Sequence, residues 1–158
     1  DNQIALVGRL KKAGATHAFA GGDGADIAIM ARDASQLDAD IVFAGGEALR
    51  VAQDTVPFAT GTLMIALPEW SDVADGKALE AFTAAGIIPE GYALPAYAAV
   101  QVAQAASVAG KPMSDALTGQ DFATAIGTIR FDEKGDLTEN PYRAWRFDGQ
   151  RFAPVEDQ

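Results

Sequence analysis

Apolar residues in the first third of the chain recur at two spacings, and the alternation between these spacings predicts a repeated unit. A short apolar run at residues 17–20 (HAFA) stops at the GGD of residues 21–23. Apolar positions between residues 27 and 37 then follow at the spacing of one helical face. A second short run at residues 41–44 (IVFA) stops at the GGE of residues 45–47. The pattern predicts a strand, a helix and a second strand.

A strand–helix–strand unit places its two strands parallel in one sheet, with the helix over one face. Both glycine pairs then lie at the same edge of the sheet. Ligands of open α/β sheets bind at that edge, outside the carboxyl ends of the strands. A carboxylate follows each glycine pair, Asp23 after Gly22 and Glu47 after Gly46. These four residues are the predicted ligand-binding residues.

The rest of the chain predicts an α/β fold with three parallel strands in a doubly wound arrangement. Residues 4–12 predict a short amphipathic helix, residues 48–53 a weak helix, and residues 61–67 a third apolar strand that Pro68 ends. Helices are then expected within residues 71–86, 91–110 and 114–117, a strand at 127–131, a turn at 132–136, and a hairpin of residues 142–147 and 150–155 around Asp148-Gly149.

Composition narrows the function classes. The 158 residues carry 12 Lys+Arg against 22 Asp+Glu, a net charge of −10, which argues against nucleic acid as a partner. The absence of cysteine excludes disulfides, thiolate metal sites and a cysteine nucleophile. No apolar run approaches the length of a membrane span, and the first residues lack a signal-peptide pattern. We expect a soluble chain, with the signal of any exported parent outside it.

Four stretches, in their order and spacing, resemble a known family. They are ALVGRLKKAGATHAFAGG, the GGE after the next strand, GYALPAYAAVQVAQAASVAG, and IGTIRFDEKGDL followed by YRAWRFDGQRF. The resemblance that they carry covers essentially the whole chain. They resemble the C-terminal half of the branched-chain amino acid-binding proteins, which are type I periplasmic solute-binding proteins of ABC importers.

The resemblance implies two lobes, each a three-layer αβα doubly wound parallel sheet, joined by three crossing segments around a ligand cleft. It assigns residues 1–67 to the end of lobe II, 71–131 to the end of lobe I, and 142–158 to a hairpin returning to lobe II. Residues 68–70 and 132–141 are two crossings. It also implies a periplasmic location, an amino acid or related small amide or amine as ligand, and the membrane subunits of an ABC importer as partners. No cofactor and no metal are implied.

The resemblance also implies roles for the two carboxylates. Glu47 matches the acidic residue that grips the ammonium group of the ligand. Asp23 stands where the aliphatic binders of the family carry an aromatic residue. This departure favours a ligand with more donors or an additional positive charge, because an unpaired buried carboxylate is costly. The groups that bind the ligand carboxylate belong to the half that this chain lacks.

Other interpretations of the two carboxylates stay open. Asp23 is equally well explained as the N-cap of the following helix, and Asp26 offers an alternative cap. Glutamate is a poorer cap, so ligand contact is favoured for Glu47. The same fold serves ligand-sensing regulators, and Asp23 with Glu47 also suits a Mg²⁺-dependent α/β hydrolase. No nucleophile elbow or HExxH motif occurs, so the prediction is a binding protein and not an enzyme.

The helices of residues 71–131 are expected to expose an apolar face, because no run of parallel strands accompanies them. The face predicts either a homodimer of this chain or association with the missing N-terminal half.

Overall fold

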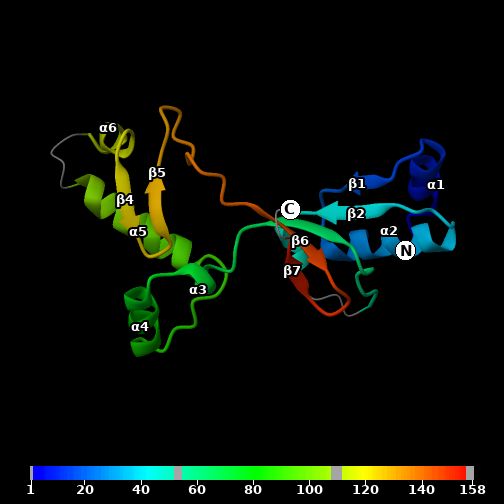
Figure 1. Ribbon diagram of the computed structural model, residues 1–158, viewed down its shortest axis with the longest axis horizontal. Coiled ribbons are helices and arrows are strands. Elements are labelled where there is room, and N and C mark those ends of the chain that lie inside the picture. Colours follow the sequence, from blue (N-terminus) through cyan, green and yellow to red (C-terminus); the bar gives the residue numbers. More distant parts are fainter. Residues whose placement is uncertain (1, 52–54, 108–111, 156–158) are drawn as a thin grey trace. The chain divides into compact units, whose positions relative to one another are not determined.

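The computed structural model describes residues 2–51, 55–107 and 112–155. The chain folds into two compact units (Figure 1). Unit 1 comprises Asp1–Leu67 and Tyr142–Gln158, and unit 2 comprises Pro68–Pro141. The assignment of these units to the two lobes of a receptor stays a prediction.

Unit 1 is built on a five-stranded sheet with strand order β1-β2-β3-β6-β7. The first three strands are parallel. The terminal hairpin adds β6, which runs antiparallel to β3, and β7, which runs antiparallel to β6. The elements are α1 (Ile4–Lys12), β1 (His17–Phe19), α2 (Gly24–Gln36), β2 (Val42–Gly45), the 3₁₀ helix η1 (Glu47–Arg50), β3 (Leu63–Ala66), β6 (Arg143–Phe147) and β7 (Phe152–Pro154). The predicted strand–helix–strand unit, third strand and hairpin are confirmed.

The apolar face of α2 explains why the repeated unit folds as predicted. Ile27, Met30 and Ala34 lie on that face, and all three are buried in the core of unit 1. They recur three or four residues apart, which keeps them on one side of the helix. The helix therefore covers the sheet and leaves the carboxyl ends of β1 and β2 at one edge.

The weak helix predicted at residues 48–53 is observed only in its first residues. Among the described residues of this segment, the chain forms the short 3₁₀ helix η1, in which the Leu49 N–H donates to the Gly46 carbonyl at 3.1 Å. Leu49 is its only buried residue, and Val51 is already extended with a ψ of 124°. A single buried side chain gives no second turn of apolar face, so nothing stabilises a longer helix. Residues 52–54 lie outside the described residues.

Unit 2 is mainly helical. Its elements are α3 (Trp70–Val73), α4 (Gly76–Ala84), α5 (Ala93–Ser107), α6 (Met113–Leu117), β4 (Asp121–Thr124) and β5 (Gly127–Arg130). The predicted helix in residues 71–86 divides into α3 and α4, because Asp75 caps α4 by accepting the Lys77 N–H at 3.1 Å. Trp70 is partly buried and packs against a small core around Leu94.

The strand β4 was missed by the sequence pattern. It pairs antiparallel with β5, and its one buried residue is Phe122. The turn between them carries no Asn-Gly or Asp-Gly pair; Gly127 supplies the left-handed backbone with a φ of +101°. The turn is held from outside the hairpin, because the side chain of Gln101 accepts the Ala125 N–H at 2.7 Å. A contact between α5 and a distant turn has no local signature.

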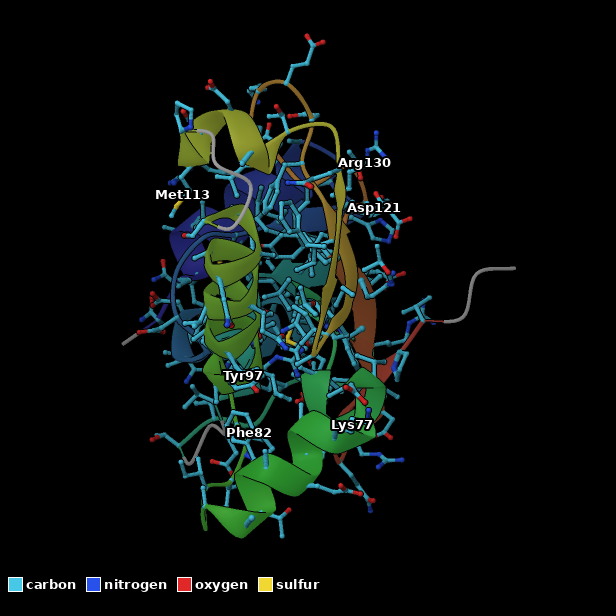
Figure 2. All side chains as sticks on the ribbon, turned by 90° about the vertical axis from the view of Figure 1, so that its left-hand side faces the viewer. Lys77, Phe82, Tyr97, Met113, Asp121 and Arg130 are labelled. Carbon is cyan, nitrogen blue, oxygen red and sulfur yellow. The ribbon has the colours of Figure 1, made fainter. Side chains whose placement is uncertain are left out.

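The helix α5 buries one face and exposes another. Leu94, Ala98, Val102 and Ala106 are buried, whereas Val100 on the other side is 66% exposed. Figure 2 shows α5 beside β4 and β5, with Tyr97 and Phe82 near its lower end. Their rings meet edge to face with centroids 5.7 Å apart. The exposed apolar residues include Ile88 and Tyr92, so unit 2 carries the kind of apolar surface that the sequence predicts.

A buried carboxylate fastens the first helix to the second. Asp33 of α2 is fully buried and accepts hydrogen bonds from the backbone N–H of Gln3 and from the Arg32 guanidinium, with Nη2 at 2.7 Å. Burial is the largest influence and raises the pKa of Asp33. The hydrogen bonds from Gln3 and Arg32 and the charge of Arg32 together outweigh it, so the pKa lies below its usual value.

We expect Asp33→Asn to lower the stability of the chain most at neutral pH. A depressed folded-state pKa stabilises the fold fully above the unfolded pKa of about 3.9, and this contribution is lost as the pH falls through the folded-state value. The difference in unfolding midpoint between wild type and variant should therefore shrink below about pH 4. Urea unfolding across pH 3–7 measures it, with Asp40→Asn as the exposed control. A difference that stays constant with pH contradicts this role of Asp33.

Candidate functional site

The carboxyl ends of the three parallel strands meet at one edge of the unit 1 sheet. In the pairing register, Phe19 of β1 lies beside Ala44 of β2, and Gly45 lies beside Met64 of β3. Asp23 follows β1 and Glu47 follows β2, so both predicted carboxylates come from the same edge and from neighbouring strands. The topology thus places them where ligands of open α/β sheets bind.

Asp23 is the N-cap of α2. Its backbone is extended, with φ −87° and ψ 169°, and its Oδ1 accepts the Asp26 N–H at 3.0 Å. The preceding Gly22 has a φ of +142°, which residues with a side chain rarely adopt. The capping interpretation of Asp23 is therefore realised in the structure, with Asp23 and not Asp26 as the cap. A ligand contact by Asp23 stays a prediction.

Both oxygens of the Glu47 carboxylate have partners within unit 1. Oε1 lies 2.5 Å from Arg50 Nε in an ion pair, and Oε2 accepts the backbone N–H of Leu67 at 2.9 Å. The side chain is 36% exposed. Gly46 precedes it as the N-cap of η1, without a side chain to shield the carboxylate. Glu47 therefore sits at the predicted edge, but in the structure it is paired with an arginine of the same chain.

Arg50 and Trp145 complete this arrangement, and the sequence interpretation missed both. Arg50 Nη2 donates to the carbonyl of Leu67, and its guanidinium carbon lies 5.1 Å from the centre of the Trp145 ring. The Trp145 indole N–H donates to the Ala66 carbonyl at 3.4 Å. The three-residue spacing of Glu47 and Arg50 is one that brings charges together on a helical turn, so it was a usable signal. Trp145 comes from the terminal hairpin, and no local pattern places it here.

The chain is closely packed at Gly45, two residues before Glu47. A Cβ atom on Gly45 would lie 2.4 Å from Ile27 Cδ1 and 2.5 Å from Leu49 Cδ1, so only glycine fits. A Cβ atom on Gly46 would have no other atom within 4 Å. The first glycine of the pair is required by the core, and the second leaves the edge open.

Metal chemistry finds no support in the described residues. Within residues 2–51, 55–107 and 112–155, no group of three or more His, Asp or Glu side chains is placed to hold a metal ion. Among the helices in this part of the chain, none has the length and apolar character needed to cross a membrane.

Comparisons with known proteins identify relatives over nearly the whole chain. A leucine-, isoleucine-, valine-, threonine- and alanine-binding protein of Pseudomonas aeruginosa is 32% identical in an alignment of 161 positions, which spans 93% of this chain and 43% of the relative. The chain is a relative of the branched-chain amino acid-binding proteins. It spans less than half the length of these curated relatives, as expected of one half. No family model matches the chain.

Solved structures of this family share the fold. A leucine-binding protein from Thermotoga maritima superposes with a TM-score of 0.70 at 17% identity, covering 99% of this chain and 48% of that protein. A branched-chain amino acid ABC transporter protein from Rhodospirillum rubrum gives 0.71 at 19% identity, covering 98% of this chain and 49% of that one. The predicted α/β fold of a type I periplasmic binding protein, present as a fragment, is thus confirmed.

Proposed function

We propose that the chain forms part of a periplasmic receptor that binds an amino acid or a related small amide or amine and delivers it to an ABC importer. The observation that carries the proposal is the position of Glu47, a half-buried carboxylate at the carboxyl edge of the parallel sheet. The relatives named for binding branched-chain amino acids, threonine and alanine support the ligand class.

In this proposal the ammonium group of the ligand is held by the Glu47 carboxylate. Oε1 and Oε2 already accept hydrogen bonds from cationic and neutral N–H donors, Arg50 Nε and Leu67 N. An ammonium group is a donor of the same kind. Gly22 and Gly46 leave room for the ligand to approach the backbone, and Asp23 adds negative charge near the cation. A ligand that bridges two lobes stabilises the closed state by its contacts to both.

The receptor needs more than this chain. We assign unit 1 to lobe II and unit 2 to lobe I, with the segments between them as crossings. Groups that bind the ligand carboxylate would come from sequence that corresponds to the other half of the relatives. The apolar surface of unit 2, with Tyr97, Val100 and Tyr92, is where that half or a second copy of the chain would pack.

Calorimetric titration of the complete gene product and of this chain tests the proposal. L-Leucine, L-alanine, L-asparagine, L-lysine and short amides are the ligands. We expect the complete gene product to bind at least one amino acid, and this chain alone to bind none measurably, because the ligand would touch one lobe only. Binding of no amino acid by the complete protein would contradict the receptor function. Saturable Mg²⁺ binding that is lost on Asp23→Asn would favour the hydrolase instead.

A further inference from the structure

Leu67 is the last residue of the first segment of unit 1. Side chains of η1 hold both of its backbone polar groups. Its N–H donates to Glu47 Oε2 at 2.9 Å, and its carbonyl accepts from Arg50 Nη2. The strand β3 ends one residue earlier, at Ala66, and unit 2 begins one residue later, at Pro68. The chain that leaves unit 1 is thus fastened by two side chains and not by the sheet ladder.

The two side chains also hold each other. Arg50 Nε and Glu47 Oε1 are 2.5 Å apart, and the guanidinium lies over the ring of Trp145. Their side chains are 26% and 36% exposed, so the pair is partly withdrawn from water. An ion pair that also bonds backbone groups and stacks on an aromatic ring is held more firmly than an exposed pair. We call Glu47, Arg50 and Leu67 the crossing latch.

We propose that Arg50 is a positioning residue that occupies the Glu47 carboxylate in the ligand-free protein, so that a cation binding to Glu47 opens the crossing latch and frees Leu67. The effect of the bound cation rests on the proposed function, whereas the pairing of Arg50 with Glu47 does not. A ligand ammonium competes with Arg50 for the same oxygens, and what releases Arg50 also releases the carbonyl of Leu67. Ligand occupancy is then linked to the start of the segment that leads to unit 2.

Linkage makes the effect reciprocal. If ligand binding must displace Arg50, part of the binding free energy is spent on opening the latch. A variant whose latch is already open therefore binds the same cation more tightly. A merely structural Arg50 predicts the opposite, because a loosened site binds more weakly.

Arg50→Met in the complete gene product tests the proposal. Methionine keeps an unbranched apolar stem against Trp145 and removes the charge and the donors. Arg130→Met is the matched control, because Arg130 of β5 pairs with Asp121 of β4 at 3.1 Å (Figure 2). This pair is distant from Glu47 in the sequence. The hydrogen-exchange rate of the Leu67 amide measures how often the crossing latch opens. Calorimetry with L-leucine, L-alanine and L-lysine measures how the substitution changes ligand affinity.

We expect the Leu67 amide to exchange about tenfold faster in Arg50→Met than in wild type, and the dissociation constant of the bound amino acid to fall about five- to tenfold. Arg50→Lys should restore part of the protection, and Arg130→Met should change neither quantity. Adding the amino acid to wild type should speed exchange at Leu67.

Four results count against the latch, the linkage or the receptor function, and they separate the three. Unchanged Leu67 exchange in Arg50→Met removes the latch, whatever the ligand does. Weaker amino acid binding by Arg50→Met, or continued protection of Leu67 in the bound wild type, removes the linkage and leaves the receptor function intact. If neither these amino acids nor L-asparagine and the short amides bind any form, the receptor function fails, and the latch is decided by exchange in the ligand-free proteins alone.

Discussion

Replacing Gly45 by alanine is expected to lower the free energy of unfolding by about 1–3 kcal/mol, the range for overpacking a closed core. The added Cβ would lie 2.4 Å from Ile27 Cδ1 and 2.5 Å from Leu49 Cδ1. Both side chains are buried at 0% and 1% exposure, so neither has free space to move into. Ile27 belongs to α2 and Leu49 to η1, so the strain falls on the elements that carry both candidate carboxylates.

Gly46→Ala is the matched control for this experiment. A Cβ on Gly46 meets no atom within 4 Å, and its φ of −93° suits any residue. Urea unfolding of the two variants under the same conditions should separate them by most of the predicted loss. Equal stabilities would show that Ile27 and Leu49 adapt without cost and that the glycine pair is not required by packing.

Replacing Glu47 by glutamine is expected to weaken binding of an ammonium-bearing ligand by more than about tenfold, which is about 1.4 kcal/mol. The amide keeps the shape of the side chain and an acceptor for the Leu67 N–H, but it removes the negative charge that faces the cation. The fold should therefore survive while affinity falls. Calorimetric titration of the complete gene product measures the change.

Glu80→Gln provides the same substitution at an exposed position of α4. It should leave the affinity unchanged. Equal weakening by both variants would point to the overall negative charge of the protein, which acts at long range, and not to contact with Glu47.

The sequence predicts the repeated unit of unit 1 well because each of its signals is local. The apolar residues of α2 share one face, the glycine pairs end the strands, and Asp148-Gly149 marks the hairpin turn. In the structure Asp148 Oδ1 accepts the N–H groups of Gln150 and Arg151, and these bonds hold the pKa of Asp148 below its usual value. Turn chemistry of this kind depends on neighbouring residues only, so the amino-acid sequence alone predicts it.

The elements that the sequence did not predict depend on contacts between distant residues. The strand β4 has one buried residue, Phe122, and its turn is held by Gln101 of α5. The weak helix after Glu47 gives way to η1 because Leu49 alone is buried. Tertiary contacts decide such short segments, and propensity over a few residues does not.

The sequence predicts which sheet edge carries Asp23 and Glu47, but it does not predict the partners of the two carboxylates. Strand topology places Asp23 and Glu47 at one edge, as expected. The bond from Asp26 N to Asp23 and the pairing of Glu47 with Arg50 both arise from the backbone that follows each strand. The three-residue spacing between Glu47 and Arg50 could have predicted their ion pair. Trp145 contacts Arg50 only because β6 pairs with β3.

The most direct test of the receptor function compares two ligands on two proteins. The ligands are the tightest-binding amino acid of the titration series and the matching 2-hydroxy acid, in which a hydroxyl replaces the ammonium group. The proteins are the wild type and Glu47→Gln, each as the complete gene product. If Glu47 holds the ammonium group, the substitution weakens binding of the amino acid by more than about tenfold and changes the affinity for the hydroxy acid by less than about twofold. Equal effects on both ligands, or none on either, would contradict the role of Glu47 as the ligand-binding carboxylate.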